Sequence, residues 1–420
     1  MGRKSLHSPK AGRGLVGVGR FQRRNNGRYL TMNYLTRTVW ILSFVSLLTD
    51  VASEMLYPIM PVYLRSIGFS VLLIGILEGL AEATAGLSKG YFGKLSDSRG
   101  KRVPFVRLGY ALSALSKPMM AVFVYPVWIF MGRTMDRLGK GIRTGARDAL
   151  LSDEATEGTK GRVFGFHRSM DTLGAVAGPA LALAWLSFNP GRYRLLFLIA
   201  FVPGVLAIAL SMLLRDKARA GVKKERVSFF SFLHYWRYSS PVYQRLVVGL
   251  LVFALCNSSD VFLLLRVKQA GFSDSLTIGV YIFYNVVYAL SAFPFGGLAD
   301  RIGLKRVFLI GLALFVIVYS GMAWRGGFAW YMALFFIYGL YAAATEGVTK
   351  AWISNIADKS DTGTAIGAYT GMQSICALLA STLTGWIWGQ FGAGAAFLLS
   401  AVGAAGVLLY VGWAVAWDRR

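Results

Sequence analysis

Long apolar segments recur along this chain and limit what it can fold into. An α-helix rises 1.5 Å per residue, so about 20 apolar residues in a helix span the ~30 Å hydrocarbon core of a bilayer. Such segments occupy residues 37–63, 71–95, 104–124, 127–150, 163–187, 194–214, 244–267, 275–299, 306–324, 328–354, 364–388 and 393–416. We therefore expect an all-α polytopic membrane protein with twelve transmembrane helices.

The composition argues against a soluble globule. Only 15% of the 420 residues are charged and 55% are hydrophobic, whereas about 25% of a soluble domain is charged. The two cysteines, Cys256 and Cys376, both lie inside apolar segments. They indicate small hydrophobic side chains, not a redox pair or a metal site. We expect no metal and no cofactor.

The net charge of +25 is concentrated in particular connections. Residues 1–31 hold eight Lys and Arg and no acid, and the even-numbered connections between spans carry most of the remaining excess. These connections contain Arg99, Lys101, Arg102 and Arg107; Lys160 and Arg162; Arg215, Lys217, Arg219, Lys223, Lys224 and Arg226; and Arg301, Lys305 and Arg306. The positive-inside rule then predicts that both termini are cytoplasmic. We expect the membrane to be a bacterial inner membrane. The charge indicates contact with lipid headgroups, not with nucleic acid.

An internal repeat divides the chain. Gly93–Asp97 corresponds to Gly296–Asp300 at a shift of 203 residues, and Arg147 corresponds to Lys350 at the same shift. We expect two pseudo-symmetric six-helix bundles, because transporters arise by such duplication. The expected parts are a basic, disordered extension at 1–31, with translation starting at Met32 as a hypothesis, bundles at 32–214 and 241–420, and a cytoplasmic linker at 215–240.

Two cytoplasmic connections share one motif. They read Gly93-x-Leu95-Ser96-Asp97-x-x-Gly100-Lys101-Arg102 and Gly296-x-Leu298-Ala299-Asp300-Arg301-x-Gly303-x-Lys305-Arg306. Glycines permit close helix approach and a tight turn, and a carboxylate at a helix end can cap a neighbouring helix. The motif resembles the signature loop of the major facilitator superfamily. The resemblance implies that Asp97 helps latch the two halves in the outward-facing state, although Ser98 stands where that family often has Arg.

A second motif, Gly174-Ala175-Val176-Ala177-Gly178-Pro179, lies in the fifth span. Its small residues permit close helix packing, and Pro179 favours a kink. It resembles the motif of proton-coupled antiporters in this superfamily, which implies export. Ala180 and Leu181 replace the usual glycine pair, and a plain packing role is the alternative.

Carboxylates lie inside the first two spans. Asp50 and Glu54 are four residues apart, as are Glu78 and Glu82, so each pair shares a helix face. An intramembrane charge costs on the order of 2.5–3.5 kcal/mol and usually faces a cavity or a partner. We expect these four carboxylates to form an acidic patch that can carry a proton.

The fourth and fifth spans are also charged. The fourth presents Arg133, Asp136, Arg137, Lys140, Arg143 and Arg147 within one helical arc. We expect this stripe to pair with the acidic patch. Arg137 also matches the membrane-buried Arg of the superfamily's span-four motif. In the fifth span His167, Arg168 and Asp171 lie close together, so His167 is a candidate for proton handling.

The second half carries fewer charges in its spans. Asn257 and Asp260 lie in the seventh span, and Glu346 lies in the tenth. We infer that coupling chemistry resides mainly in the first half. The alternative is that the charges of the first half form a structural network bracing its bundle.

These features predict a secondary transporter working by alternating access, acting as a monomer on a small molecule. Proton-coupled efflux by antiport is the first expectation, and a proton symporter or uniporter importing a polar metabolite is the second. An intramembrane enzyme would need a nucleophile–base pair or a metal cluster, and His167 is the only histidine in the spans. A sensor built on the transporter fold is the remaining alternative.

Overall fold

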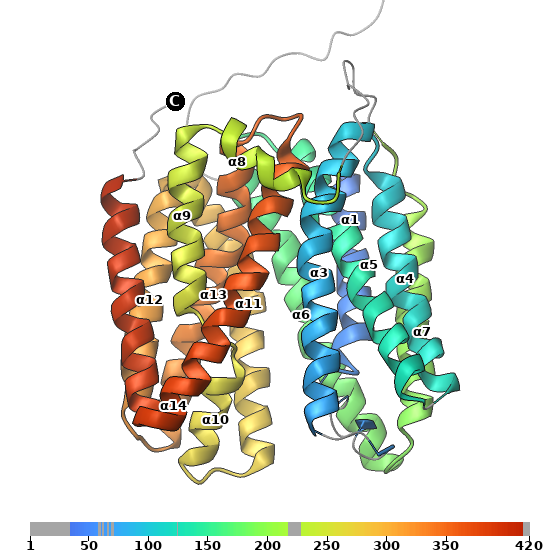
Figure 1. Ribbon diagram of the computed structural model, residues 1–420, viewed down its shortest axis with the longest axis vertical. Coiled ribbons are helices and arrows are strands. Elements are labelled where there is room, and N and C mark those ends of the chain that lie inside the picture. Colours follow the sequence, from blue (N-terminus) through green and yellow to red (C-terminus); the bar gives the residue numbers. More distant parts are fainter. Residues whose placement is uncertain are drawn as a thin grey trace, which may run out of the picture. The chain divides into compact units, whose positions relative to one another are not determined.

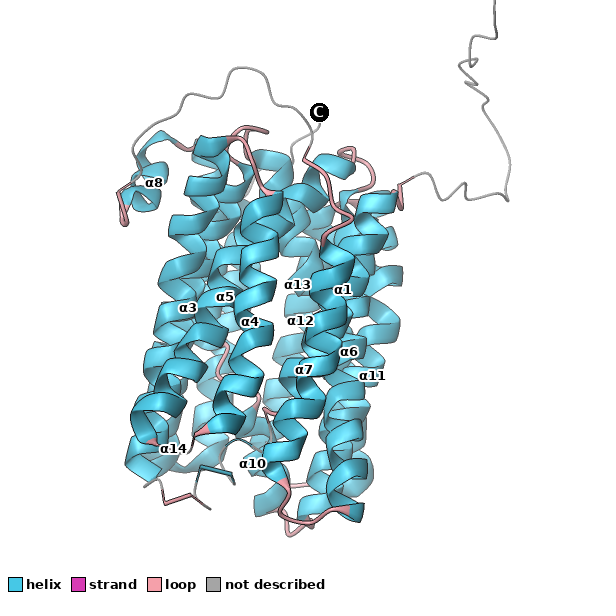
Figure 2. Cartoon of the chain, turned by 90° about the vertical axis from the view of Figure 1, so that its right-hand side faces the viewer, coloured by secondary structure: helices cyan, strands magenta, loops and turns pink. Residues whose placement is uncertain are grey.

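The structure is a computed structural model that describes residues 34–57, 60, 63–64, 67–68, 71–123, 125–216 and 228–414. Each secondary-structure element that it describes is a helix (Figure 2). The expected extension at 1–31 lies outside the described residues, as do residues 217–227 of the expected linker.

The described helices fall into two groups that lie side by side in Figure 1. We name them the N-terminal half and the C-terminal half. The first contains α1 (Arg37–Glu54), α3 (Val71–Arg99), α4 (Val103–Val122), α5 (Pro126–Glu154), α6 (Lys160–Phe188) and α7 (Tyr193–Ser211). The second contains α9 (Pro241–Cys256), α10 (Val261–Gln269), α11 (Asp274–Ile302), α12 (Leu304–Ala323), α13 (Phe328–Ile356) and α14 (Thr362–Ala414), preceded by the short helices η1 (Ser231–His234) and α8 (Tyr235–Tyr238).

These helices make twelve spans, because α9 and α10 form one span and α14 forms two. A non-helical residue, Gly392 with φ of 85°, separates the two parts of α14. By length and composition, seven of the described helices could cross a membrane, with α9–α10 and α14 each counted once. The expected all-α, twelve-helix membrane fold is confirmed.

Two spans differ from their expected form. The first was expected over 37–63, but α1 ends at Glu54, four residues before Pro58. The seventh was expected to be continuous over 244–267, but it breaks between α9 and α10. The residues of the break are Asn257-Ser258-Ser259-Asp260, whose short polar side chains compete with the helix for backbone hydrogen bonds.

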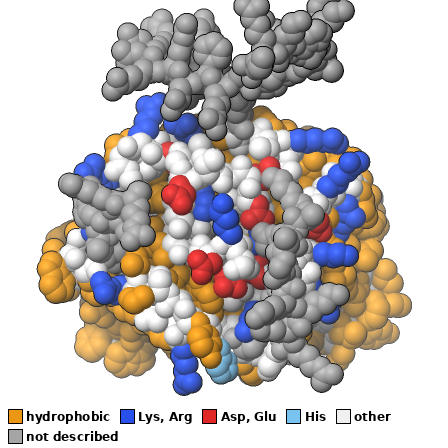
Figure 3. All heavy atoms as spheres, turned by 90° about the horizontal axis from the view of Figure 1, so that it is seen from above, with side chains coloured by type: hydrophobic (Ala, Val, Ile, Leu, Met, Phe, Trp, Pro, Cys, Tyr) orange, Lys and Arg blue, Asp and Glu red, His pale blue; other side chains and the backbone are white. Residues whose placement is uncertain are grey.

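Large apolar side chains cover much of the outer surface. Leu290 and Leu409 are exposed by 68% and 72%, and Val202 is exposed by 58%. So much exposed apolar area is costly in water and suits a lipid environment. The end view in Figure 3 shows Lys, Arg, Asp and Glu side chains gathered on the face near α8, with hydrophobic side chains around its edge.

Two helix pairs hold the halves together: α6 packs against α11, and α3 packs against α14. Glycines allow both approaches. A Cβ on Gly161 would collide with the backbone of Gly296, and a Cβ on Gly93 would collide with the backbone of Gly363. The two interfaces are therefore equivalent under the internal repeat, because Gly93 corresponds to Gly296.

Candidate functional site

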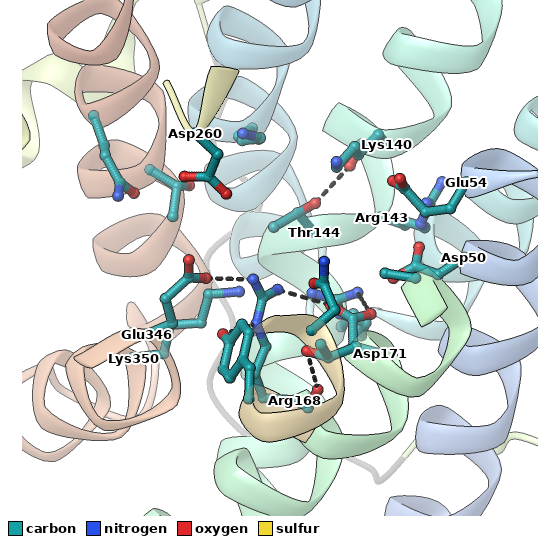
Figure 4. A pocket seen from close by; sticks show the side chains of 18 of the residues that line it. Asp50, Glu54, Lys140, Arg143, Thr144, Arg168, Asp171, Asp260, Glu346 and Lys350 are labelled. Carbon is teal, nitrogen blue, oxygen red and sulfur yellow. Dashed lines mark hydrogen bonds and ion pairs between the residues drawn. The ribbon is translucent and has the colours of Figure 1, made fainter. Parts of the chain in front are cut away.

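A cavity of about 340 Å³ lies between the two halves. Its walls come from α1, α3, α5 and α6 on one side and from α11, α13, α14 and the α9–α10 break on the other. Eleven of its lining side chains are ionisable carboxylates or bases: Asp50, Glu54, Asp171, Asp260 and Glu346, with Lys89, Lys140, Arg143, Arg147, Arg168 and Lys350. Figure 4 shows that these groups converge from several helices.

Asp171 of α6 is the centre of a charge network. Its carboxylate lies 2.8 Å from the Arg168 guanidinium and 3.9 Å from that of Arg147. The Ser46 hydroxyl of α1 donates to it at 2.5 Å, and Arg147 donates to Ser46 at 3.1 Å. The network therefore ties α1, α5 and α6 together beside the cavity.

Among the described residues, three ion pairs cross from one half to the other, and one of them joins Arg162 of α6 to Asp300 of α11 at 3.7 Å. The other two lie beside the cavity. The Arg168 guanidinium lies 2.5 Å from the carboxylate of Glu346, and the Lys350 ammonium lies 2.8 Å from the carboxylate of Asp148. Arg168 also donates to the hydroxyl of Tyr288 on α11. Arg168 is about 12 Å along α6 from its first residue, at 1.5 Å per residue. The pairs thus lie between the cavity and the helix ends near α8.

Asp50, Glu54 and Lys140 line the N-terminal wall of the cavity. The ion pairs of the described residues include neither Asp50 nor Glu54. These two carboxylates therefore face the cavity without a fixed counter-ion. The expected second pair, Glu78 and Glu82, lies on α3, but its side chains are outside the described part of the structure.

The break in the seventh span brings polar groups to the opposite wall. Asp260 lines the cavity and accepts a hydrogen bond of 2.7 Å from the Tyr338 hydroxyl. Asn257 donates to the hydroxyl of Tyr341 at 3.0 Å and lines a smaller adjoining cavity of about 90 Å³, which Glu346 and Lys350 also line.

Part of the charged stripe on α5 lies inside the N-terminal half and does not line the cavity. Asp136 pairs with Lys117 of α4 at 2.6 Å and with Arg133 at 3.7 Å, and all three are buried within the N-terminal half. Arg137 is also buried, whereas Lys140 is exposed to the cavity. Asp136 of the stripe is therefore paired inside the bundle, with a lysine of α4.

His167 is buried, and neither ring nitrogen has a hydrogen-bond partner in the described part of the chain. It precedes Arg168 on α6. It lies outside the lining of the cavity of about 340 Å³.

Two latches close the end near α8. The backbone N–H and hydroxyl of Thr364, at the start of α14, donate to Asp97 at 2.7 and 3.0 Å. The backbone N–H groups of Gly161 and Arg162, at the start of α6, donate to Asp300 at 2.7 and 2.9 Å. Each carboxylate thus caps a helix of the other half.

Arg102 braces the first latch. It is almost fully buried and pairs with Asp97 at 3.0 Å and with Asp153 at 2.5 Å. Gly100 and Gly303 have positive φ angles of 63° and 102°, which turn the chain after each latch carboxylate. Lys101 and Arg301 are both exposed. Arg301 was predicted to lie in a connection, but α11 continues to Ile302 and includes it in its last turn.

The small-residue motif of α6 packs on α1. A Cβ on Gly174 would lie 2.6 Å from the Leu47 carbonyl, and a Cβ on Gly178 would lie 2.7 Å from the Met55 nitrogen. Pro179 is buried beside them. The motif thus fixes the position of the helix that carries Asp50 and Glu54.

Sequence reasoning missed several residues of the site. Lys89 and Asp148 were not singled out, and Lys350 was noted as the repeat partner of Arg147 but was not placed among the site residues. Lys117 was missed as the partner of Asp136. Each is a charged side chain inside an apolar segment, which is the signal that could have found it.

Twelve apolar spans in two halves, a charged cavity between them and latches at one end define a membrane carrier. The family profile of the Major Facilitator Superfamily matches residues 42–287 and 276–420. The chain belongs to this superfamily of transporters.

Relatives span most of the chain. MJ1317, an MFS-type transporter of Methanocaldococcus jannaschii, is 31% identical over 361 residues, which cover 84% of this chain and 89% of that protein. The inner membrane transport protein YajR of Escherichia coli is 25% identical over 380 residues, which cover 88% of this chain and 81% of that protein. The quinolone resistance protein NorA of Staphylococcus aureus is 21% identical over 220 residues, which cover 51% of this chain and 56% of that protein.

The fold also matches solved structures. The crystal structure of the human organic anion transporter MFSD10 (TETRAN) aligns with a TM-score of 0.74 at 16% identity. The alignment covers 89% of this chain and 99% of that chain. At this identity the likeness establishes the fold.

Proposed function

We propose that the protein exports a small organic molecule in exchange for protons, by alternating access. The observation that carries the proposal is the cavity between the halves, which is lined by five carboxylates and six bases and bounded toward one end by ion pairs and latches. In duplicated transporters the substrate binds between the repeats, and rocking of the halves exposes it to each side in turn.

The latched end is the cytoplasmic end in this proposal. The latch loops belong to the even-numbered connections, which hold most of the positive charge. Both termini are then cytoplasmic, and the latched state is the outward-facing one. The printed name of YajR places that relative in an inner membrane, and we extend this location to the present chain.

Asp50 and Glu54 are the proposed proton carriers. They face the cavity without a fixed counter-ion among the described residues, and Asp171 beside them is held by two arginines. A carboxylate that can be reached from the cavity can exchange a proton as the halves rock. His167, buried near the same network, is a proposed further proton acceptor.

Export is favoured over import by the packing of Gly174 and Gly178 on α1, in the motif that resembles that of antiporters. The name of NorA, a quinolone resistance protein, is consistent with export. A proton symporter or uniporter importing a polar metabolite is the second candidate, because the mixed charge of the cavity also suits a polar metabolite.

The test is transport by purified protein in proteoliposomes under an imposed pH gradient, with a panel of quinolones, aromatic amines and organic acids. Antiport predicts that a substrate moves against the proton flow and that Asp50→Asn and Glu54→Gln abolish the coupling. The matched control is Glu157→Gln, an exposed carboxylate in the connection between α5 and α6. Movement with the proton flow, or movement independent of pH, would overturn antiport in favour of the second candidate.

A further inference from the structure

We propose that Asp260 and the tyrosines beside it bind the positively charged group of the substrate, which is an organic amine or a quaternary ammonium compound. This inference deepens the proposed function and rests on it, because it assumes that the cavity between the halves receives the substrate. It assigns substrate recognition to the C-terminal wall, whereas the proposed proton carriers lie on the N-terminal wall.

Asp260 is placed for this role by the break between α9 and α10. The break puts the carboxylate in the cavity lining, where Figure 4 shows it on the opposite side from Lys140 and Glu54. The hydrogen bond from Tyr338 holds one carboxylate oxygen, Oδ1, at 2.7 Å. The ion pairs of the described residues do not include Asp260, so its negative charge remains available to a ligand.

A wall of tyrosine rings adjoins this carboxylate. Tyr281, Tyr284 and Tyr288 lie three and four residues apart on α11, and all three line the cavity. The ring of Tyr284 lies 5.0 Å from that of Tyr338, which holds Asp260. A carboxylate beside several aromatic faces is the arrangement that recognises organic ammonium ions, through cation–π attraction and charge.

The wall already accepts one cation. The Arg168 guanidinium lies 5.3 Å from the centre of the Tyr288 ring. Arg168 is committed to Asp171 and Glu346, so it occupies the end of the wall nearest the latches. Tyr281 and Tyr284, which precede Tyr288 on α11 and lie farther from the latch carboxylate Asp300, remain to face a ligand.

The other bases of the cavity have partners or lie on the far wall, which favours a cation at this wall. Lys89 donates to Ser374 of α14 at 3.2 Å. Arg147, Arg168 and Lys350 are each paired with carboxylates. Arg143 donates to Ser113 at 2.6 Å and lies over the ring of Tyr110. Lys140 is on the far wall, on the side of Asp50 and Glu54. Asp260 is therefore the carboxylate of the C-terminal wall that a substrate cation can neutralise.

Direct binding tests the inference without requiring transport. The probe is benzyltrimethylammonium, titrated into purified protein in lipid nanodiscs and followed by calorimetry. Benzyl alcohol and benzoate, which present the same ring as a neutral molecule and an anion, are the matched ligands. We expect the ammonium compound to bind at least about tenfold more tightly than either.

The variants distinguish the contribution of the Asp260 charge to binding from that of the Tyr284 ring. Asp260→Asn should weaken binding of the probe by about tenfold or more, and Tyr284→Leu should weaken it by about fivefold, whereas Tyr284→Phe, which keeps the ring, should bind nearly as the parent protein does. Glu157→Gln, at an exposed carboxylate outside the cavity, should leave this affinity unchanged. Thermal unfolding of each variant identifies any that misfold. If Tyr284→Leu does not fold, the affinities of Asp260→Asn and Tyr284→Phe relative to the parent protein still test the inference.

The outcomes distinguish the two proposals. Tighter binding of benzoate than of the ammonium probe, or unchanged affinity in Asp260→Asn, would overturn this inference even if proton-driven transport of another compound is observed. Binding of the probe that depends on Asp260, without any pH-driven transport, would support this inference and contradict antiport.

Discussion

The carboxylate of Asp97 on α3 accepts a hydrogen bond of 2.7 Å from the backbone N–H of Thr364 on α14, across the boundary between the two halves. Asp300 on α11 accepts an equivalent bond of 2.7 Å from Gly161 on α6. The two contacts are related by the internal repeat, and each satisfies a backbone donor that the start of a helix leaves free. The same kind of contact, a carboxylate that caps a helix of the other half, therefore joins the halves at two places at the latched end.

The latches should therefore set the conformational equilibrium. We expect Asp97→Ala or Asp300→Ala to shift it toward the state open at the latched end by about fivefold to tenfold each, since a helix cap contributes about 1 kcal/mol. The double variant should approach the product of the two effects, because the sites are distant and independent.

Thiol labelling measures this shift. Ala175 lines the cavity, so Ala175→Cys in a background without Cys256 and Cys376 reports access from each side in vesicles of known orientation. Arg301→Ala, at an exposed position in the last turn of α11, is the control. Unchanged access in the double variant would show that the latches do not hold the closed end.

The buried pair of Lys117 and Asp136 leads to a stability prediction. Both side chains are under 10% exposed and lie 2.6 Å apart. Lys117→Met should lower the free energy of unfolding by about 3–5 kcal/mol, because Asp136 would keep a buried charge with a weaker partner. Lys117→Met with Asp136→Leu should recover most of that loss. The measurement is the unfolding midpoint in detergent, and a double variant less stable than the single one would refute the argument.

A related comparison concerns Arg137 and Arg301. Arg137 is buried in α5, whereas Arg301 is exposed at the end of α11. We expect Arg137→Ala to reduce the yield of folded protein several-fold and Arg301→Ala to leave it nearly unchanged, because only the first removes a buried charged group from its partners. Quantitative size-exclusion chromatography from matched membrane preparations decides the ranking, and the reverse order would contradict it.

The sequence predicted the fold because its signals are local. Apolar length identifies a span, and the correspondence of Gly93 with Gly296 reveals the repeat without any structure. The resemblance of the Asp97 loop also implied a latch, and the structure supplies its partner, Thr364.

The ion-pair and hydrogen-bond partners of the intramembrane side chains could not be predicted, because they depend on how each helix is rotated and packed. The sequence places Asp136 on a charged face of its span, but it does not show that Lys117, 19 residues earlier, faces it. The break at Asn257–Asp260 had a visible signal in four consecutive short polar residues, which the hydropathy of the whole segment concealed. The three tyrosines of α11 share a helix face that the sequence shows, but the contact of Tyr338 with Asp260 needs both α13 and the α9–α10 break in place.

The ion pair between Lys350 and Asp148 leads to the last prediction. Asp148 is fully buried and also pairs with Arg147 at 3.0 Å, so it keeps a partner when Lys350 is lost. Lys350→Met should therefore preserve folding but remove a bond between the halves, raising access from the latched end by about fivefold or more. Lys350→Arg keeps the charge and should retain the parent behaviour. In the Ala175→Cys labelling assay, a Lys350→Met variant that matches Lys350→Arg would show that this pair braces the protein without controlling which side is open.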